Sequence, residues 1–338
     1  MIVTSLKGRD MVTLKDYTTD EMYLIWETTA DLKRRQKRGE SLDLLKNKVL
    51  AMFFEIPSTR TSVSFETAMA QLGGHAIYLA PGRTWIGIEE SWADAMKVIG
   101  RYADAIVARL MEHSLLVNIA DWVDIPVING SDDWEHPCQA LTDFYTVFER
   151  KRRLEGLKYT ICWGWRHSNA PIGLVHSSLY VASRMGVDFV IACPEGYDPD
   201  KEVLEFAKCE AEKSGGSIEI VRSIEEAVDG ADVINIYSWT PPEIFRKGIE
   251  TYRAGKGFTA PAPHLEKPDE YKKWKVTVDH VKMAKKSAIT MHCMPVARGE
   301  ECEDEVVDGP WSVMLDEAEN RLHVQKAILA LLIGGYAP

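Results

Sequence analysis

Short apolar runs that alternate with amphipathic helical segments constrain the fold of this chain more than any other feature. The run Val49–Phe54 has the continuous apolar character of a buried strand, and Phe65, Ala68, Met69 and Leu72 then recur at helical spacing. The same alternation continues through both halves of the chain. Strands that are separated by helices form parallel sheets covered on both faces. The pattern therefore predicts an α/β protein with two doubly wound parallel-sheet domains.

The bounds of the expected elements follow from changes in this pattern. In the first half we expect helices over 19–38, 62–72, 91–102 and 133–153, and strands over 49–54, 75–79, 105–109 and 125–130. In the second half we expect strands over 159–163, 187–193, 217–221, 231–236 and 288–292, and helices over 172–185, 201–213, 224–228 and 324–333. Residues 240–275 are expected to form a long loop with some helix.

A charged run, Glu149–Gly156, marks the expected domain boundary. We expect residues 1–150 to form the first domain, joined by a C-terminal helix over 322–338, and residues 151–321 to form the second.

Composition excludes several classes of function. The net charge of −11 argues against a general nucleic-acid or membrane binder. No apolar run is long enough to span a membrane, and the first residues are too polar for a secretory signal. The six cysteines lack metal-type spacing and indicate free thiols in the cytoplasm. This spacing predicts no metal site.

The stretch Ser58–Thr61 lies where the first strand ends and a helix begins. A helix N-terminus offers unpaired N–H groups and the positive end of a dipole, which suits an anion. Three hydroxyls and the Arg60 guanidinium are groups that hold a phosphate. The same residues also fit a helix cap with nothing bound, and this stretch alone does not separate the two interpretations.

Other strand ends carry chemically useful groups as well. They are Arg109, the segment His136–Gln139, the segment His292–Pro295, and Asn320–Arg321 at the expected start of the last helix. A single arginine at a strand end is usually an ion-pair partner. However, ligands collect at the carboxyl ends of parallel strands, so the recurrence predicts a site for a small phosphorylated substrate.

The full set of motifs resembles the ornithine/aspartate carbamoyltransferase family. Ser58–Thr61 looks like its phosphate-binding S-T-R-T, and His136–Gln139 looks like its H-P-x-Q. His292–Pro295 resembles the H-C-L-P of the ornithine branch, with methionine for leucine, and Asp316–Arg321 is similar to its E-A-E-N-R. The resemblance covers about residues 10 to 335 and implies transfer of a carbamoyl group from carbamoyl phosphate to an amine, with release of phosphate. It also implies that the reaction needs neither a metal nor an organic cofactor.

The resemblance also implies a role for each matching residue. Those that would hold the phosphate are Ser58, Thr59, Arg60 and Thr61. Those that would hold and polarise the carbamoyl group are Arg109, His136, Gln139 and Arg321, with help from Cys293 and Met294, and Cys293 would also lie near the attacking amine. The family shares its sites within a homotrimer, and in this chain the loop that would enter the neighbouring subunit carries Arg83 and Trp85.

The acceptor side departs from the family pattern. Tyr237 stands where ornithine enzymes carry an aspartate, and Ser62 replaces a second arginine. The expected acceptor residues are Asn169, Tyr237, Trp239 and Cys293. The run 77–82 together with Arg298–Glu301 is similar to putrescine carbamoyltransferase.

Three functions therefore stay open. The first is a carbamoyltransferase for an amine of the ornithine or putrescine type. The second is the same reaction on an N-acylated ornithine or another non-standard amine. This second function gains support because a buried α-ammonium needs a carboxylate or several acceptors, and Tyr237 offers a phenol. On that ground we expect free ornithine to be a poor acceptor. The third is a non-catalytic homologue that binds carbamoyl phosphate.

Overall fold

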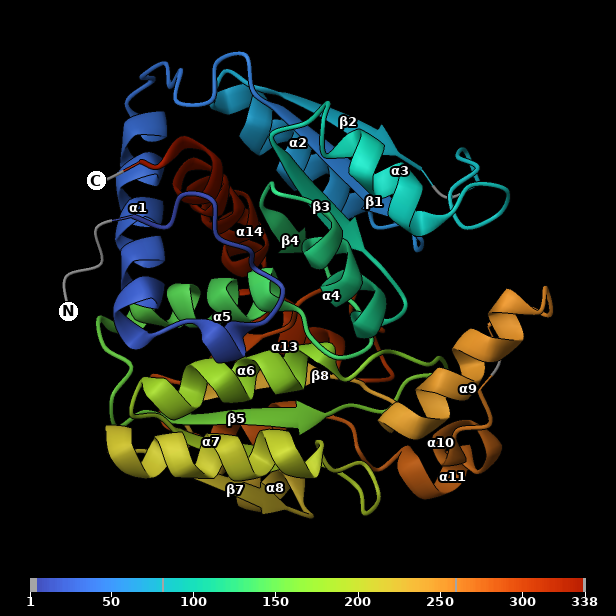
Figure 1. The fold of residues 1–338 in the computed structure, drawn as a ribbon. Coiled ribbons are helices and arrows are strands. Elements are labelled where there is room, and N and C mark those ends of the chain that lie inside the picture. Colours follow the sequence, from blue (N-terminus) through green and yellow to red (C-terminus); the bar gives the residue numbers. More distant parts are fainter. Residues whose placement is uncertain (1–4, 81, 259, 337–338) are drawn as a thin grey trace. The chain divides into compact units, whose positions relative to one another are not determined.

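Parallel strand pairing organises both halves of the chain (Figure 1). The computed structural model describes residues 5–80, 82–258 and 260–336. Position 81 of the run 77–82 and the outermost residues of the expected segments 1–150 and 322–338 lie outside this range. Contacts divide the chain into two units, each with its own sheet. Unit 1 comprises residues up to Leu141 together with those from Glu319 onward, and unit 2 is Thr142–Ala318.

Unit 1 contains a four-stranded parallel sheet in the order β2-β1-β3-β4. Its elements are η1 (Leu14–Asp16), α1 (Thr19–Lys37), β1 (Val49–Phe54), α2 (Thr59–Gln71), β2 (His75–Leu79), α3 (Trp92–Ile99), β3 (Ala105–Arg109), α4 (His113–Trp122) and β4 (Val127–Asn129).

Two helices belong partly to each unit. Helix α5 (Pro137–Lys151) contains the first boundary, and α14 (Met314–Leu329) contains the second. A π-helical turn, η2 (Ala330–Gly334), follows α14. The charged run near 150 is thus the end of α5, and the contact boundary falls earlier, inside that helix.

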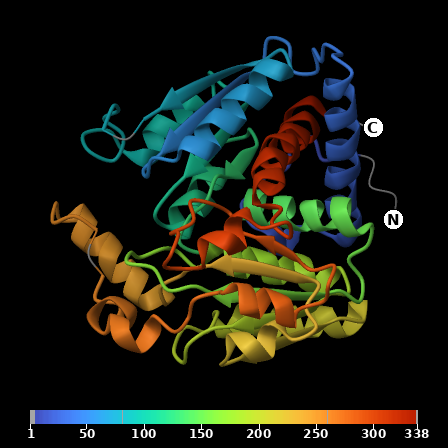
Figure 2. The ribbon, with the colours of Figure 1, turned by 180° about the vertical axis from the view of Figure 1, so that it is seen from behind.

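Unit 2 contains a five-stranded parallel sheet in the order β7-β6-β5-β8-β9. Its strands are β5 (Lys158–Trp163), β6 (Asp188–Ala192), β7 (Ser217–Val221), β8 (Val233–Tyr237) and β9 (Ile289–Met291). Its helices are α6 (Gly173–Arg184), α7 (Lys201–Ser214), α8 (Ile224–Val228), α9 (Pro242–Arg253), α10 (Pro263–Glu266), α11 (Pro268–Tyr271), α12 (Val278–Met283) and α13 (Asp304–Asp308). Helices α6 and α7 pack together in front of this sheet in Figure 1, and Figure 2 shows its other face with α8 and α12.

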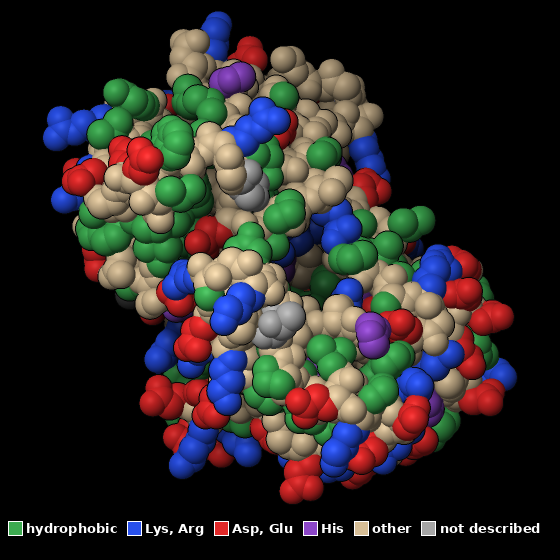
Figure 3. Space-filling model, turned by 90° about the vertical axis from the view of Figure 1, so that its right-hand side faces the viewer, with side chains coloured by type: hydrophobic (Ala, Val, Ile, Leu, Met, Phe, Trp, Pro, Cys, Tyr) green, Lys and Arg blue, Asp and Glu red, His purple; other side chains and the backbone are tan. Residues whose placement is uncertain are grey.

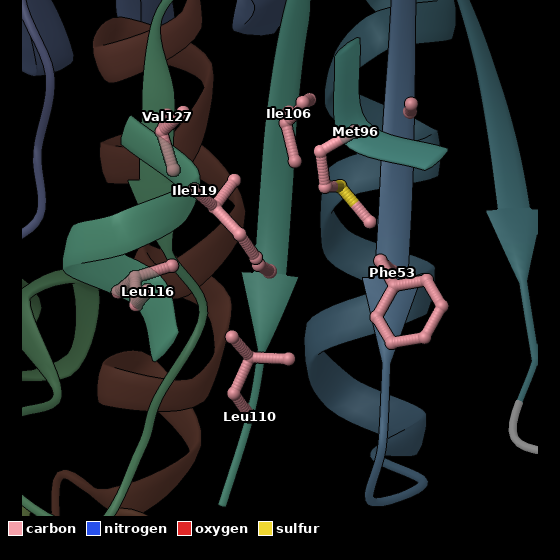
Figure 4. Packing of buried hydrophobic residues seen from close by; sticks show 9 residues of the cluster. Phe53, Met96, Ile106, Leu110, Leu116, Ile119 and Val127 are labelled. Atoms are coloured by element: carbon pink, nitrogen blue, oxygen red, sulfur yellow. The ribbon is translucent and has the colours of Figure 1, made fainter. Parts of the chain in front are cut away.

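Side-chain alternation along the strands of unit 1 creates its core. Phe53 and Ile106 lie on the face of the sheet that α3 and α4 cover, where Met96, Leu116 and Ile119 pack against them (Figure 4). The ribbon of α2 lies behind the strands in the same view, on the opposite face. Helices on both faces of a parallel sheet confirm the doubly wound architecture.

Most predicted elements form close to their expected bounds, with informative exceptions. Helix α2 begins at Thr59 rather than at 62, because Ser58 caps it: the Ser58 hydroxyl accepts a hydrogen bond from the Thr61 N–H. Helix α14 begins at Met314, so the expectation that Asn320 and Arg321 start the last helix is wrong. The sequence analysis did not predict α4, α12 or α13. Among the described residues, no helix is both long and apolar enough to cross a membrane.

Leu116→Ala is expected to destabilise unit 1 by about 2–5 kcal/mol, because it leaves a cavity in this core. Val117→Ala on the same helix is the matched control, since Val117 is 40% exposed and Leu116 is fully buried. Chemical denaturation followed by circular dichroism measures both. Equal losses in the two variants would contradict the assignment of the core.

Candidate active site

The carboxyl edge of the unit 1 sheet is where its strand order reverses. The chain passes from β1 to β2 on one side and then to β3 on the other, so β1 and β3 flank the switch point. Ligands of open α/β sheets bind at this point. Phe54 and Arg109, the last residues of the two strands, are partners in the register. Ser58–Thr61 follows β1 directly, so both groups predicted from the sequence lie at this switch point.

Helix α2 begins at Thr59 and carries Arg60 in its first turn. Ser58 is the N-cap, and its hydroxyl also donates to Thr61 Oγ1 at 3.0 Å. The Ser62 hydroxyl donates to the Ser58 carbonyl oxygen at 2.9 Å, so Ser62 turns back onto its own helix. Capping by Ser58 is therefore real. It leaves the Arg60 guanidinium and the helix dipole as the features suited to an anion.

Arg321 draws three distant segments together within unit 1. Its guanidinium donates to the Gln139 side-chain oxygen and, at 3.3 Å, to Thr61 Oγ1. Its Nη1 atom lies 3.5 Å from His136 Nε2. Helix α14 thereby connects the start of α2 with the start of α5. The structure thus brings together four of the residues predicted from the sequence.

His136 is a half-buried imidazole among positive charges. Burial lowers its pKa well below the ordinary value, and the charges of Arg321, Arg109 and Arg60 lower it further. The ring is therefore neutral at neutral pH. Three guanidinium groups with no added imidazolium form a positive centre in a chain whose net charge is −11. Such a centre suits a small dianion.

Unit 2 carries the second set of predicted residues after β9. The His292 ring is buried and accepts a hydrogen bond at Nδ1 from the Met294 N–H at 2.8 Å, and its Nε2 lies 3.3 Å from a Glu301 carboxylate oxygen. The His292 N–H donates to Glu317 at 3.0 Å. These contacts hold the segment from His292 to Met294, which includes the half-buried Cys293. The Met294–Pro295 peptide bond is cis.

Glu301 is a buried residue that the sequence analysis did not single out as a site residue. Besides its contact with His292, its carboxylate accepts a hydrogen bond from the Ala297 N–H at 2.6 Å and lies 3.7 Å from Arg166 Nη1. The Cβ atom that any larger residue would place at Gly164 would lie 2.9 Å from Glu301 Cβ. Only the tertiary packing of unit 2 identifies this carboxylate.

Three of the four predicted acceptor residues, Asn169, Tyr237 and Trp239, lie at or after the ends of β5 and β8, which flank the switch point of the unit 2 sheet, whereas Cys293 follows β9. The Tyr237 hydroxyl donates to the Pro171 carbonyl oxygen at 2.6 Å, and the Asn169 side-chain oxygen accepts from the Thr240 hydroxyl at 2.8 Å. Trp239 is fully buried and donates its indole N–H to the Tyr197 carbonyl oxygen at 2.7 Å. The Trp239 ring therefore packs as part of the unit 2 interior.

The predicted neighbouring-subunit loop lies on the surface of unit 1. Arg83 is exposed, and Trp85 is 64% exposed. The Trp85 carbonyl oxygen accepts N–H groups from Ile88, Glu89 and Glu90, which fold the loop into a tight turn. The indole is thus presented outward.

His136→Gln is expected to reduce the loss of stability in acid. Below about pH 6.5 the unfolded wild-type chain takes up a proton at this histidine, whereas the folded chain does not. The free energy of unfolding therefore falls as the pH drops toward the depressed folded-state pKa. Glutamine binds no proton, so denaturation from about pH 7 to about pH 5 should increasingly favour the variant over wild type. His75→Gln, at an exposed position on β2, is the control. A stability difference that stays constant with pH would contradict the neutral assignment.

Comparison with known proteins identifies the family. The family model described as the aspartate/ornithine carbamoyltransferase carbamoyl-P binding domain matches residues 9–149, and the Asp/Orn binding domain model matches residues 155–332. The chain is 44% identical to the ornithine carbamoyltransferase of Pyrococcus abyssi over 99% of this chain and 98% of that protein. The solved structure of ornithine carbamoyltransferase from Pyrococcus furiosus is 42% identical, covers 99% of this chain and 100% of its own, and superposes with a TM-score of 0.87.

A more distant likeness exists to an acetylornithine transcarbamylase complexed with acetylcitrulline. It is 30% identical, covers 96% of this chain and 99% of its own, and has a TM-score of 0.85. The higher identity to ornithine carbamoyltransferases favours an ornithine-type acceptor over the alternatives of an N-acylated ornithine and a non-catalytic homologue. With two family models covering nearly its whole length, this chain belongs to the aspartate/ornithine carbamoyltransferase family.

Proposed function

We propose that this enzyme transfers the carbamoyl group of carbamoyl phosphate to an amine of the ornithine type and releases phosphate. The observation that carries the proposal is the arginine cluster of unit 1. Its guanidinium at Arg321 contacts Gln139, Thr61 and His136, and the charges of Arg109 and Arg60 also act to lower the His136 pKa. Carbamoyl phosphate combines a dianionic phosphate with a planar carbonyl. The cluster supplies charge for the first and hydrogen-bond donors for the second.

In this proposal the start of α2 and Arg60 hold the phosphate. Arg109, His136 and Gln139 hold the carbamoyl group. Arg321 contacts one residue of each group, Thr61 among the phosphate-binding residues and Gln139 among the carbamoyl-binding residues. The amine nitrogen attacks the carbonyl carbon, a carbon–nitrogen bond forms, and negative charge develops on the carbonyl oxygen. The carbon–oxygen bond to phosphate then breaks, and the amine loses a proton. Fixed donors that stabilise the developing charge supply most of the rate enhancement.

The acceptor is assigned to unit 2, in agreement with the description of the model that matches it. The proposed contacts are Cys293 and Met294 from the segment after β9, and Asn169 and Tyr237 from the switch point. The fully buried Trp239 ring stacks with the Tyr237 ring, with centroids 6.2 Å apart, and is assigned a supporting part. In this proposal these residues contribute to the rate mainly by orienting the amine nitrogen toward the carbonyl carbon. The Tyr237 hydroxyl donates a hydrogen bond to the Pro171 carbonyl oxygen. A tyrosine at the position where ornithine enzymes carry an aspartate therefore changes the shape of the proposed amine site and also removes a negative charge.

Arg60→Ala is expected to lower kcat/KM for carbamoyl phosphate about 10- to 150-fold or more, because one charge-assisted hydrogen bond is worth about 1.5–3 kcal/mol. The matched control is Arg101→Ala, which removes an exposed arginine just after α3 in the same unit. A steady-state assay of phosphate release measures both variants. If Arg60→Ala is as active as Arg101→Ala, Arg60 does not bind the phosphate of carbamoyl phosphate as proposed.

We further propose that the enzyme is a homotrimer or a multiple of one, in which the loop with Arg83 and Trp85 completes the site of a neighbouring subunit. Large apolar side chains are exposed on unit 1, and Figure 3 shows hydrophobic groups gathered on the part of this unit that faces the viewer. The exposed side chains are Val63, Ile77, Trp85, Ile88, Val98, Tyr102 and Val117. Exposed apolar groups that gather on one face, as in Figure 3, mark protein–protein contact.

Light scattering is expected to give a mass that is a multiple of three chains of 38.1 kDa. Ile88→Asp should shift the mass toward the single chain, because Ile88 is 71% exposed beside Trp85 and would bury a charge in the contact. Leu315→Asp, at a 79% exposed position of unit 2, should leave the mass unchanged. A fully active single chain at assay concentration would rule out the shared site.

The proposed compartment is the cytoplasm. All six cysteines are free thiols in the structure, and four of them are buried. Free thiols persist where the compartment is reducing.

A further inference from the structure

The segment Gly130–Glu135, which joins β4 to α5, supports two members of the proposed site at once. Arg109 Nη1 donates to the Gly130 carbonyl oxygen at 3.0 Å, and the Leu110 N–H donates to the Ser131 carbonyl oxygen at 3.1 Å. His136 follows the segment directly and immediately precedes α5. The conformation of this segment therefore sets the positions of Arg109 and His136 together.

A single buried carboxylate organises the segment. The Asp132 side chain is fully buried and accepts four hydrogen bonds. Oδ1 accepts the N–H groups of Trp134 at 2.8 Å and Glu135 at 2.6 Å. Oδ2 accepts from His113 Nδ1 at 2.7 Å and from Asn129 Nδ2 at 2.8 Å. A carboxylate with four donors is well suited to burial, and removing it would leave those donors unsatisfied.

The donors come from separate elements, so Asp132 joins them. His113 is the first residue of α4, and its backbone N–H also donates to Asp133 at 2.8 Å. Asn129 ends β4 and donates as well to the Val12 carbonyl oxygen at 3.0 Å. The carboxylate thus connects β4, α4 and the segment before His136 within unit 1.

The backbone of this segment needs such support. Ser131 has a φ of 120°, a region that residues with a Cβ atom rarely occupy. Conformations of this kind persist only where surrounding contacts impose them. The Ser131 N–H donates to the Asn129 side-chain oxygen at 2.8 Å, and that same Asn129 contacts Asp132. The strained turn and the carboxylate are parts of one network.

The state of His113 agrees with this arrangement. Burial acts to lower the His113 pKa, but the hydrogen bond and negative charge of Asp132 outweigh it and raise the pKa above its ordinary value. A protonated Nδ1 is what an acceptor-only carboxylate requires.

We propose that Asp132, assisted by His113, is a positioning residue that holds the turn between β4 and α5 so that Arg109 and His136 face the carbamoyl group. The inference rests on the proposed function, since it assigns Asp132 a part in the same reaction without contact to the substrate. Misplacement of groups that act in the transition state lowers kcat more than it raises KM.

The test compares Asp132→Asn with Asp104→Asn in the full-length enzyme. Asp104 is the matched control because it organises the opposite, amino edge of the same sheet: its carboxylate binds Lys48 Nζ at 2.7 Å and the Val49 N–H at 2.9 Å. Asp132→Asn should lower kcat by about 10- to 100-fold and leave KM for carbamoyl phosphate within about threefold. Asp104→Asn should lower the melting temperature while kcat stays near that of wild type.

If Asp132→Asn fails to fold, a second pair of variants, at His113, tests the same positioning role. His113→Asn keeps a donor near the position of Nδ1 and should retain most of kcat, whereas His113→Leu removes the donor and should lose it. Equal kcat in these two variants, or wild-type kcat in a folded Asp132→Asn, would overturn the inference. If Arg60→Ala abolishes turnover while Asp132→Asn is fully active, only the positioning role fails. If Arg60→Ala is fully active, the proposed function fails instead.

Discussion

The hydrogen bonds of the Arg321 guanidinium hold together the residues proposed to bind carbamoyl phosphate. They join α14 to the first turn of α2 and to the start of α5, and these segments are far apart in the sequence. Placing three guanidinium groups near one half-buried histidine costs free energy through the repulsion of like charges. The neutral state of His136 limits that cost. A bound dianion would offset the rest, so the same arrangement that is unfavourable when empty favours phosphate.

Strand order explains why both substrates find chemically useful groups. In each sheet successive strands are added first on one side and then on the other. This change of side occurs between β1 and β3 in unit 1 and between β5 and β8 in unit 2. The loops that leave these strands diverge, which opens space at the carboxyl edge. Ser58–Thr61 and Arg109 occupy this edge in unit 1, and Asn169 and Tyr237 occupy it in unit 2. One architectural rule, applied twice, thus places the proposed phosphate-binding residues and the proposed amine-binding residues at the carboxyl edges of their sheets.

The elements with strong apolar periodicity could be predicted from the sequence, and the buried polar contacts could not. Strand β1 forms over its expected residues because Val49–Phe54 is continuously apolar. The first half of α14 was not predicted because Asp316–Asn320 is acidic and polar. Those residues are held by tertiary contacts such as the 2.7 Å hydrogen bond between Lys33 and Asn320. The burial of Asp132 and Glu301 could not be predicted, since His113 reaches Asp132, and His292 and Arg166 reach Glu301, only in the folded chain.

Transfer of the carbamoyl group from carbamoyl phosphate to an amine is tested most directly by following phosphate and the ureido product together. The assay supplies carbamoyl phosphate with a panel of ornithine, an N-acylated ornithine, putrescine, lysine and aspartate. We predict that an amine of the ornithine type accelerates phosphate release, with one ureido group formed for each phosphate. The order of specificity constants within the panel also shows whether Tyr237, in place of an aspartate, makes free ornithine a poorer acceptor than the other amines. Phosphate release that no amine raises above the spontaneous decomposition of carbamoyl phosphate would contradict the proposed reaction.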